Sequence, residues 1–478
     1  MISKFVREQK GYTQKELCNK LECTEDTIVP IIKKLKEYGV LKQKKRSDLK
    51  GDLSDLMDEE PEVVDVEVGA NDNIYWFPFV GLIVVAGRVL KCYPKYLLSQ
   101  DAPLKVLQQV IKVLEKHDAS KQTVRVFNET SEESSFNLLA VLLFFIQDYY
   151  ENGVYSNTEN IIETNGSGEV QWDKTVNETF ALISNNRPYY VELQTKRRKA
   201  NDYDYFKRLH ECILTRASNE LKDADLLDLF EITEVDLTDE ELDDFGDKEY
   251  ILYRIENELS MQFNTRKQLV LKTMYVYLTY NGTLDDIDTF SIFGTNNYAK
   301  VWEDVCAEIM DNQLERQLGA IRLPEPLQSS YDKGTKLIEL IEKPLWTITK
   351  KTANATLIPD LITIKDTTFI IFDAKYYNAQ LEEGKTPKGQ PGIESITKQY
   401  LYQLAYKEFI NAHSFAEVRN CFLLPTEEEE VIDKGEVSMS MLSALGLQNI
   451  KVRFLPATLA YEYYLSGRKM DISMLNLL

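Results

Sequence analysis

Two short apolar runs constrain the fold of this chain more than any other stretch of its sequence. Residues 361–364 and 369–372 are rich in β-branched and aromatic side chains, and the polar tetrapeptide 365–368 separates them. Two such runs around a short polar break predict two strands joined by a tight turn. The sequence therefore predicts a buried β-hairpin, and the polar residues at its open end become the first candidates for a functional site.

The predicted hairpin brings two acidic residues together at its open end. With the turn centred between Asp366 and Thr367, Asp360 lies opposite Asp373, unless a one-residue bulge shifts the register. Side chains alternate between the two faces of a strand, so Asp373 and Lys375 project from the same face. Crowded carboxylates repel one another unless a divalent cation lies between them, and Mg²⁺ prefers one or two carboxylates plus water and substrate phosphate. We therefore expect a Mg²⁺ site at which Lys375 orients, or helps to deprotonate, the attacking water.

These residues resemble the motif of the PD-(D/E)xK nuclease superfamily, with Pro359-Asp360 followed by Asp373-Ala374-Lys375. The motif is degenerate, and an edge hairpin that happens to have acidic ends would also contain it. Asp373 and Lys375, however, end a strongly apolar strand, where ionisable groups are costly unless they are paired or bind a metal. The resemblance implies hydrolysis of DNA phosphodiester bonds, with Mg²⁺ held by Asp360, Asp373 and the carbonyl oxygen of Ala374.

A predicted helix over residues 298–310 supplies a further candidate metal ligand. Glu303 lies on a mostly apolar face of this helix, where a carboxylate needs a partner. It is expected to bind the metal or to complete its outer shell. A glutamate at the edge of the core that pairs with a lysine is the alternative explanation.

A second predicted helix, over residues 398–407, resembles the glutamine- and tyrosine-bearing helix of superfamily nucleases, which contacts DNA or orders the site. Gln399 and Gln403 lie one turn apart, and Tyr406 follows three residues later rather than the usual four. The resemblance implies that Gln399, Gln403 and Tyr406 are DNA-binding residues.

The composition limits how the chain can meet DNA. A net charge of −21 over 478 residues argues against broad nonspecific binding to nucleic acid, so any DNA contact must be local or supplied partly by a partner. The six cysteines form no CxxC pair, which indicates neither a zinc site nor a disulfide framework. We expect a cytoplasmic protein without membrane contact, because the N-terminus lacks a signal-peptide core and the longest apolar run, residues 138–146, is too short to span a bilayer.

The first 50 residues reverse the sign of the charge, with 13 Lys and Arg against 7 Asp and Glu. Thr13 is expected to cap a helix over residues 14–21, and Thr24 a second helix that ends at about Tyr38, before Gly39. This helix-turn-helix spacing, followed by the basic residues 40–46, resembles a winged helix.

The resemblance to a winged helix implies that the second helix enters a major groove while the wing contacts phosphates. The candidate DNA-binding residues of the wing are Lys42, Lys44, Lys45 and Arg46. Winged helices also serve as protein-interaction modules, and Glu25 and Asp26 are unfavourable neighbours for phosphate, so this alternative stays open.

The sequence predicts a multidomain α+β protein. We expect a winged-helix domain over residues 1–50, an acidic linker over 51–70, and a β-rich partner-docking domain over 71–200. A helical region with an acidic loop follows over 201–290, and an α/β nuclease core of the PD-(D/E)xK type occupies 291–478.

Three stretches together resemble LlaJI-family restriction endonuclease subunits, which are relatives of McrC. They are residues 75–96, 302–306 and 372–377, and the resemblance spans most of residues 70–410. It implies a restriction system for phage defence, in which the nuclease chain works with an McrB-like AAA+ GTPase that translocates on DNA. It further implies that the N-terminal half docks onto that GTPase ring and that GTP is used by the partner, since this chain has no convincing NTPase motif. Pairing of two copies through their nuclease domains stays open.

Two other functions also fit the sequence. A stand-alone repair or recombination nuclease of the same superfamily would cut DNA without GTP. A winged-helix DNA-binding assembly factor with a vestigial nuclease fold would bind DNA but would not cut it with Mg²⁺.

Overall fold

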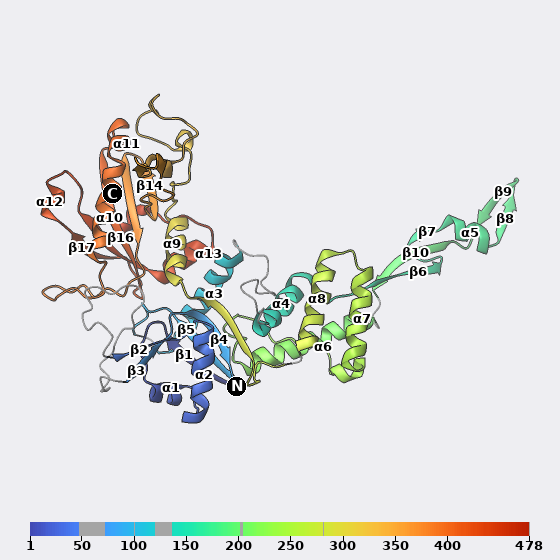
Figure 1. The fold of residues 1–478 in the computed structure, drawn as a ribbon. Coiled ribbons are helices and arrows are strands. Elements are labelled where there is room, and N and C mark those ends of the chain that lie inside the picture. The colour runs from blue at the N-terminus through green and yellow to red at the C-terminus, as the bar shows by residue number, and fades with distance from the viewer. Residues whose placement is uncertain (47–71, 100, 120–135, 201–203, 281, 478) are drawn as a thin grey trace. The chain divides into compact units, whose positions relative to one another are not determined.

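The computed structural model describes residues 1–46, 72–99, 101–119, 136–200, 204–280 and 282–477 (Figure 1). The chain divides into two compact units. Unit 1 combines Met1–Val124 with Ile292–Leu478, and unit 2 is Arg125–Ser291. These units do not coincide with the domains predicted from composition, because strands from both ends of the predicted acidic linker belong to unit 1.

The N-terminal part of unit 1 contains a four-stranded sheet with the order β1-β5-β4-β11. Strand β1 runs parallel to β5, whereas β4 and β5 form an antiparallel hairpin. A Cβ atom at Gly81 of β4 would lie 2.1 Å from the carbonyl oxygen of Phe293, so only glycine fits this approach of β11. The strands are β1 (Ile2–Arg7), β4 (Val80–Val85), β5 (Arg88–Tyr93) and β11 (Phe290–Thr295).

The N-terminal helices form where their capping residues predict. Helix α1 (Gln14–Lys20) begins with a capping box, in which the Thr13 amide donates to Glu16 Oε2 at 2.7 Å and the Glu16 amide donates to Thr13 Oγ1 at 3.2 Å. Helix α2 (Glu25–Glu37) ends before Gly39, whose φ of +68° suits glycine. Both helices lie within about one residue of their predicted ends, so this local prediction is confirmed.

The basic segment after α2 is a strand, as predicted, but its partner comes from beyond the predicted linker. Strand β2 (Lys42–Lys45) pairs antiparallel with β3 (Asn73–Trp76), and Lys45 lies opposite Asn73. The acidic residues 51–66 lie outside the described residues. Segments 1–46 and 72–99 therefore share both a hairpin and a sheet, and they form one structural body within unit 1.

The C-terminal part of unit 1 is built on a five-stranded sheet with the order β14-β15-β16-β18-β17. Strands β15, β16 and β18 are parallel, and the two edge strands β14 and β17 are antiparallel to their neighbours. One face carries apolar residues of β14 and β15 that pack against α10 and α11, and α9 and α13 also contact this sheet. The elements are β14 (Leu361–Lys365), β15 (Thr368–Ala374), β16 (Glu417–Thr426), β17 (Ile432–Val437), β18 (Ile450–Pro456), α9 (Tyr298–Ile309), α10 (Ile393–Ala405), α11 (Lys407–Ala412) and α13 (Ala457–Leu465).

Unit 1 also contains one longer helix and several short elements. The longer helix is α3 (Leu104–Ala119), which packs against α13. The short elements are η4 (Leu318–Ala320), η5 (Leu337–Leu340), β12 (Leu345–Trp346), β13 (Lys351–Thr352), α12 (Ser440–Ser443) and η6 (Ile472–Leu475).

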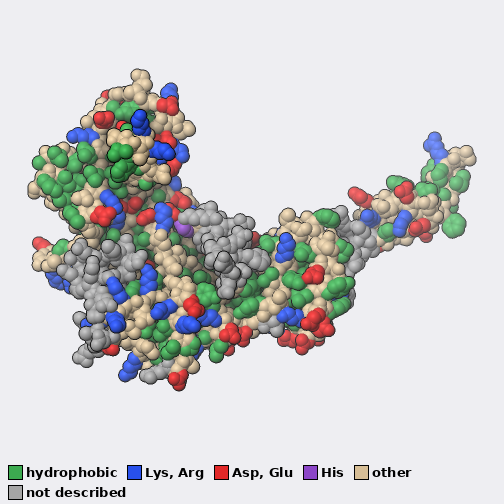
Figure 2. Space-filling view, viewed as in Figure 1, with side chains coloured by type: hydrophobic (Ala, Val, Ile, Leu, Met, Phe, Trp, Pro, Cys, Tyr) green, Lys and Arg blue, Asp and Glu red, His purple; other side chains and the backbone are tan. Residues whose placement is uncertain are grey.

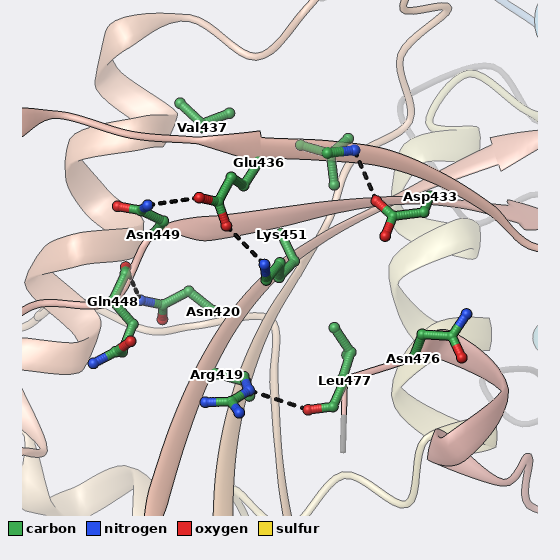
Figure 3. A network of polar contacts seen from close by, with 12 residues as sticks. Arg419, Asn420, Asp433, Glu436, Val437, Gln448, Asn449, Lys451, Asn476 and Leu477 are labelled. Atoms are coloured by element: carbon green, nitrogen blue, oxygen red, sulfur yellow. Dashed lines mark hydrogen bonds and ion pairs between the residues drawn. The ribbon is translucent and has the colours of Figure 1, made fainter.

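Polar contacts hold the C-terminal residues against the sheet (Figure 3). Arg453, only 2% exposed, donates from Nε to the carbonyl oxygen of Leu475 at 2.7 Å and from Nη1 to Asp433 at 2.6 Å. Arg419 donates from Nε to the carbonyl oxygen of Leu477 at 3.1 Å. Because the buried guanidinium of Arg453 and the half-buried one of Arg419 both donate to carbonyl oxygens at the chain end, the last described residues are part of the folded core.

Unit 2 consists of a helical part and an extended arm. The helical part contains α4 (Leu138–Asn152), α6 (Tyr205–Asp223), η3 (Leu242–Phe245), α7 (Lys248–Met261) and α8 (Thr265–Tyr280). We call residues 158–200 the arm, which Figure 1 shows projecting from these helices with β8 and β9 at its tip. The arm contains β6 (Thr158–Thr164), β7 (Glu169–Val170), α5 (Trp172–Glu178), β8 (Ala181–Ser184), β9 (Arg187–Tyr190) and β10 (Gln194–Ala200).

The predicted mixture of helices and sheets is confirmed. Within the described ranges, no helix combines the length and apolar character needed to cross a membrane.

Candidate active site

The register of the β14–β15 hairpin is the one predicted from the sequence. Leu361 pairs with Phe372, and the ladder continues without a bulge to Lys365 and Thr368. The turn is tight because Asp366 adopts a φ of +50°, a conformation that aspartate tolerates better than most residues. This pairing brings Asp360, the residue before β14, next to Asp373.

Asp360, Asp373 and Lys375 meet at the carboxyl end of β15. Asp373 is buried, with 3% of its surface exposed, and its Oδ1 lies 2.9 Å from Lys375 Nζ. The Ala374 amide donates to Asp360 Oδ2 at 2.9 Å, which fixes the second carboxylate against the same strand. The structure therefore brings together the two acids and the lysine that the sequence singled out.

The Asp360 carboxyl group is held in its protonated form. Burial, together with the hydrogen bond to Asp373 and its charge, raises the pKa of Asp360 to about 8, although Lys375 and the Ala374 amide act in the opposite direction. Near neutral pH Asp360 therefore holds a proton, which a divalent cation would replace.

Lys375 is held in its cationic form. Burial lowers the pKa of its ammonium group, but the charge of Asp373 and the hydrogen bond with it outweigh burial and hold the pKa above its usual range. A cation with a raised pKa orients water and phosphate but is a poor base. Of the two roles considered for Lys375, the geometry favours orientation over deprotonation.

Glu303 lies at the edge of this cluster on α9. Burial, followed by the charge of Asp360, raises its pKa, whereas Lys300 and Lys375 lower it. Its carboxylate lies 3.1 Å from Lys300 Nζ, so it does pair with a lysine, as the alternative explanation expected. The charges of Asp360 and Lys375 nevertheless both shift the pKa of Glu303, so Glu303 lies close enough to interact electrostatically with these two residues.

The burial of Gln399, Gln403 and Tyr406 corrects the prediction that they contact DNA. Their side chains point into the protein, with exposures of 0%, 6% and 0%. Gln399 Nε2 donates to the carbonyl oxygen of Ile371 in β15 at 2.8 Å, and Tyr406 Oη donates to that of Leu337 at 3.2 Å.

Gln403 Oε1 accepts two hydrogen bonds, from Asn420 Nδ2 at 2.7 Å and from the Gln448 amide at 2.9 Å. The resemblance left two roles open for the residues of this helix, DNA contact and ordering of the site. The burial of all three favours the second role.

Two tyrosines near the site were not among the predicted residues. Tyr402 of α10 is buried, and burial followed by the charges of Asp373 and Asp360 raises its pKa to about 12. Tyr376 follows Lys375 directly, and its Oη donates to Glu8 Oε2 at 2.5 Å in the buried core. The only sequence signal for Tyr402 was its place one turn after Gln399, and nothing in the sequence indicated the long-range contact of Tyr376 with Glu8.

The basic residues predicted to contact DNA lie on other elements. Lys42, Lys44 and Lys45 lie on β2, and Arg46 follows it directly. They are not part of the cluster at Asp373.

The donor set at the cluster fits Mg²⁺ better than a metal that needs a closed protein cage. Across the described ranges, no three His, Cys, Asp or Glu side chains are arranged to hold a metal ion. Asp360 and Asp373 with the Ala374 carbonyl supply a small set of hard oxygen donors, and Mg²⁺ usually takes one or two carboxylates and fills its other positions with water and phosphate. A divalent cation bound by these oxygens would replace the proton on Asp360.

Comparison with known proteins identifies the class of protein to which this fold and cluster belong. The model of a restriction endonuclease family matches residues 79–455, which is well over half of the chain. The chain is therefore a member of the restriction endonuclease class. More narrowly, it belongs to the LlaJI restriction endonuclease family.

Individual proteins are also similar to this chain. The chain is 24% identical over 409 residues to YdjA, a component of the type II restriction enzyme BsuMI of Bacillus subtilis, and the match covers 82% of this chain and 81% of that protein. Two solved assemblies of McrB with McrC from Thermococcus gammatolerans are also similar, at 12% identity. The match to a half-complex of McrB AAA+ hexamers with bound McrC has a TM-score of 0.36 and covers 97% of this chain and 99% of that chain. The match to the McrBC complex has a TM-score of 0.25 and covers 63% and 84%.

Proposed function

We propose that this chain is the nuclease subunit of a restriction system and that it hydrolyses DNA phosphodiester bonds with Mg²⁺ at Asp360, Asp373 and Lys375. The observation that carries the proposal is the meeting of the buried carboxylate of Asp373, the half-buried carboxylate of Asp360 and a cationic lysine at the end of a central strand. Membership in a restriction endonuclease family supports the reaction class. The spacing of the three residues supports a PD-(D/E)xK type of site.

Each residue of the cluster would have a separate role. Asp360, Asp373 and the Ala374 carbonyl would hold Mg²⁺, which when bound activates water and stabilises the charge on the phosphate in the transition state. Lys375, fixed 2.9 Å from Asp373, would orient the attacking water beside the phosphate. Glu303 would support the metal from its outer shell.

We further propose that an McrB-like AAA+ GTPase is the partner of this chain and that the arm contacts it. Large apolar side chains are exposed at the arm tip, including Phe180 at 98%, Ile183 at 69% and Leu182 at 62%. Monomeric proteins rarely expose such a patch, and a two-stranded hairpin gains little stability by itself. A partner that covers β8 and β9 explains why this surface is apolar.

Cleavage of plasmid DNA by the purified chain tests the nuclease proposal. We expect the wild type to cut only with Mg²⁺, the GTPase partner and GTP, and Lys375→Ala to abolish cutting. Lys365→Ala is the matched control, because Lys365 lies in the same hairpin and pairs with Asp471 at 2.6 Å, away from the acids.

Each result of the cleavage assay selects one function. Cutting by the wild type without partner or GTP would instead identify a stand-alone nuclease. If the wild type never cuts methylated or unmethylated DNA, the chain is a DNA-binding assembly factor, and the proposed chemistry of Asp360 and Asp373 is wrong. The same variants should be compared for protection of cells against phage.

A further inference from the structure

A buried polar contact joins the N-terminal sheet to the strand that carries the nuclease cluster. Tyr376 directly follows Lys375, and its Oη donates to Glu8 Oε2 at 2.5 Å. The Lys95 amide donates to the same carboxyl oxygen at 3.1 Å and to Tyr376 Oη at 3.3 Å. Glu8 follows β1 and Lys95 follows β5, and these two strands are parallel neighbours. The carboxyl ends of two paired strands of the N-terminal sheet therefore meet the segment that follows β15.

We propose that Glu8 is a positioning residue for the nuclease cluster and that it holds Lys375 in place through Tyr376. Lys375 needs a fixed position only if it acts in cleavage, so the inference rests on the proposed function. Glu8 contacts neither the acids of the cluster nor the place of the metal, and it acts through its neighbour alone. It precedes residues 79–455, which the family model matches, so membership in the family gives Glu8 no role.

Burial of the contact is the first argument for this role. Figure 2 shows acidic and basic side chains spread over the visible surface, where water solvates them. Glu8 and Lys95 are instead only 5% and 6% exposed, and Tyr376 is 4% exposed. Residues with charged side chains are almost never buried to this extent unless they have partners. Removing one partner leaves the other without a hydrogen bond in the core, so the contact fixes its members relative to one another.

The Lys95 side chain holds Tyr376 from a second direction. Lys95 Nζ lies 4.7 Å from the centre of the Tyr376 ring, a cation–π contact, and donates to Gln9 Oε1 at 3.2 Å. Gln9 adopts a φ of +57°, a backbone conformation that residues other than glycine keep only where their surroundings fix it. Burial, followed by the charge of Glu8, raises the pKa of the Tyr376 hydroxyl, so this group remains a hydrogen-bond donor. Both the ring and the hydroxyl of Tyr376 are therefore held by residues of the N-terminal sheet.

The position of Lys375 between two anchors is the second argument. Its amide donates to the carbonyl oxygen of Leu423 in β16 at 2.9 Å, and the next residue, Tyr376, is bonded to Glu8. The backbone at Lys375 is thus fixed by β16 and, one residue later, by the N-terminal sheet.

Small changes in the position of Lys375 matter for the proposed reaction. Lys375 Nζ lies 2.9 Å from Asp373 Oδ1, and a water oriented by Lys375 must lie in line with the phosphate. A displacement of about 1 Å in an active site can slow a reaction about 100-fold. Loss of the second anchor should therefore slow cleavage without removing any group of the cluster.

Amide hydrogen exchange of the full-length chain in EDTA tests the proposal without metal or DNA. We expect Tyr376→Phe to speed exchange of the Lys375 amide about tenfold, because the variant lacks the hydrogen bond to Glu8. Tyr96→Phe is the matched control and should leave this exchange rate unchanged. Tyr96 is also buried and its ring lies beside that of Tyr376, with centroids 6.3 Å apart, but its hydroxyl is bonded to Tyr461 Oη at 3.1 Å. Mass spectrometry of the peptide that contains Lys375 measures the rate.

Cleavage of plasmid DNA with Mg²⁺, the GTPase partner and GTP gives a second readout. Tyr376→Phe should lower kcat about 10- to 100-fold and leave KM for DNA within about twofold, because no DNA contact is removed. Glu8→Gln keeps an oxygen acceptor for Tyr376 and should retain most of kcat. Glu8→Leu has no acceptor and should lose as much as Tyr376→Phe, and the double variant should lose no more than either single variant.

Three results would overturn the proposal. They are an unchanged exchange rate of the Lys375 amide in Tyr376→Phe, an equal increase in Tyr96→Phe, and a normal kcat for Tyr376→Phe when the wild type cuts. Failure of the nuclease proposal is recognised separately, because the exchange experiment contains neither metal nor DNA. If the wild type never cuts but exchange is faster in Tyr376→Phe alone, Glu8 still positions Lys375 and only the proposed reaction is wrong.

Discussion

The β14–β15 hairpin and the β8–β9 hairpin use similar residues for opposite purposes. In β15 every residue is buried, and Phe369, Ile370 and Ile371 pack inside a five-stranded sheet. In β8 and β9 nearly every residue is exposed, although Leu182, Ile183 and Tyr189 are equally apolar. The difference shows that β-propensity alone does not locate a core. One hairpin buries its apolar residues beside the cluster of Asp360, Asp373 and Lys375, while the other leaves its apolar residues exposed.

The largest expected effect is on the rate of DNA cleavage. It comes from a substitution that removes a charge from the β14–β15 hairpin and leaves the fold of the hairpin intact. Asp373→Asn should lower the rate of DNA cleavage by about 10³-fold or more, because it removes a buried metal-binding charge. Asp366→Asn in the same hairpin should cut normally, since asparagine tolerates the φ of +50° at that turn. Cleavage rates and circular dichroism of both variants would check this. Normal cutting by Asp373→Asn would show that the cluster is not the active site.

The stability difference between the two hairpins follows from their burial. Ile371→Ala should lower the free energy of unfolding of the sheet by about 2–5 kcal/mol, because it leaves a cavity in a close-packed core. Leu182→Ala should change the free energy of unfolding by no more than about 0.5 kcal/mol, because its side chain is 62% exposed. Urea denaturation of the two variants measures both values. Equal losses would mean that the arm tip is packed within the free chain.

The arm should matter for association instead. Phe180→Ser is expected to weaken binding of the GTPase partner by about ten- to a hundredfold, as loss of an apolar anchor does at other interfaces. Phe263→Ser is the control, since Phe263 is 91% exposed but lies outside the arm. Calorimetric titration of the partner with each variant measures how much each of the two residues contributes to binding. Similar losses at both positions would assign no special role to the arm.

The smallest expected effect concerns pH. Because the pKa of Asp360 rises from 3.8 to about 8 on folding, the folded chain holds an extra proton between these values. Its stability therefore falls as pH rises towards 8. Asp360→Asn should raise the melting temperature in EDTA by a few degrees at pH 9 and by less at pH 5.

A control with the opposite sign is Asp471, which caps η6 and pairs with Lys365 of the same hairpin. Asp471 accepts from Lys365, which holds the pKa of Asp471 below its usual range, so Asp471→Asn should lower the melting temperature above pH 4. Mg²⁺ should stabilise the wild type but not Asp360→Asn. A gain for Asp360→Asn that does not grow with pH would contradict the raised pKa of Asp360.

The sequence correctly predicted those structural features that depend on residues close together in the chain. The hairpin register, the cap at Thr13 and the stop at Gly39 follow from turn and capping chemistry, and all three agree with the structure. From the register alone, Asp360 and Asp373 were correctly placed together.

The sequence did not predict contacts between distant segments. The pairing of β2 with β3 and the hydrogen bond from Tyr376 to Glu8 join residues far apart in the chain, so no local pattern indicated them. The resemblance to superfamily nucleases implied that Gln399 contacts DNA or orders the site. Its hydrogen bond to the backbone of β15 explains its burial only once the sheet is known.

Lys45 of β2 lies directly opposite Asn73 of β3, and this pairing determines how the protein tolerates a change in the length of the segment between them. The chain leaves β2 and enters β3 at neighbouring points, although 27 residues separate the two in sequence. Closing such a segment costs only about 0.6 kcal/mol more for each doubling of its length. A change in the length of the connection between Lys45 and Asn73 should therefore leave the pairing of β2 with β3 in its present register.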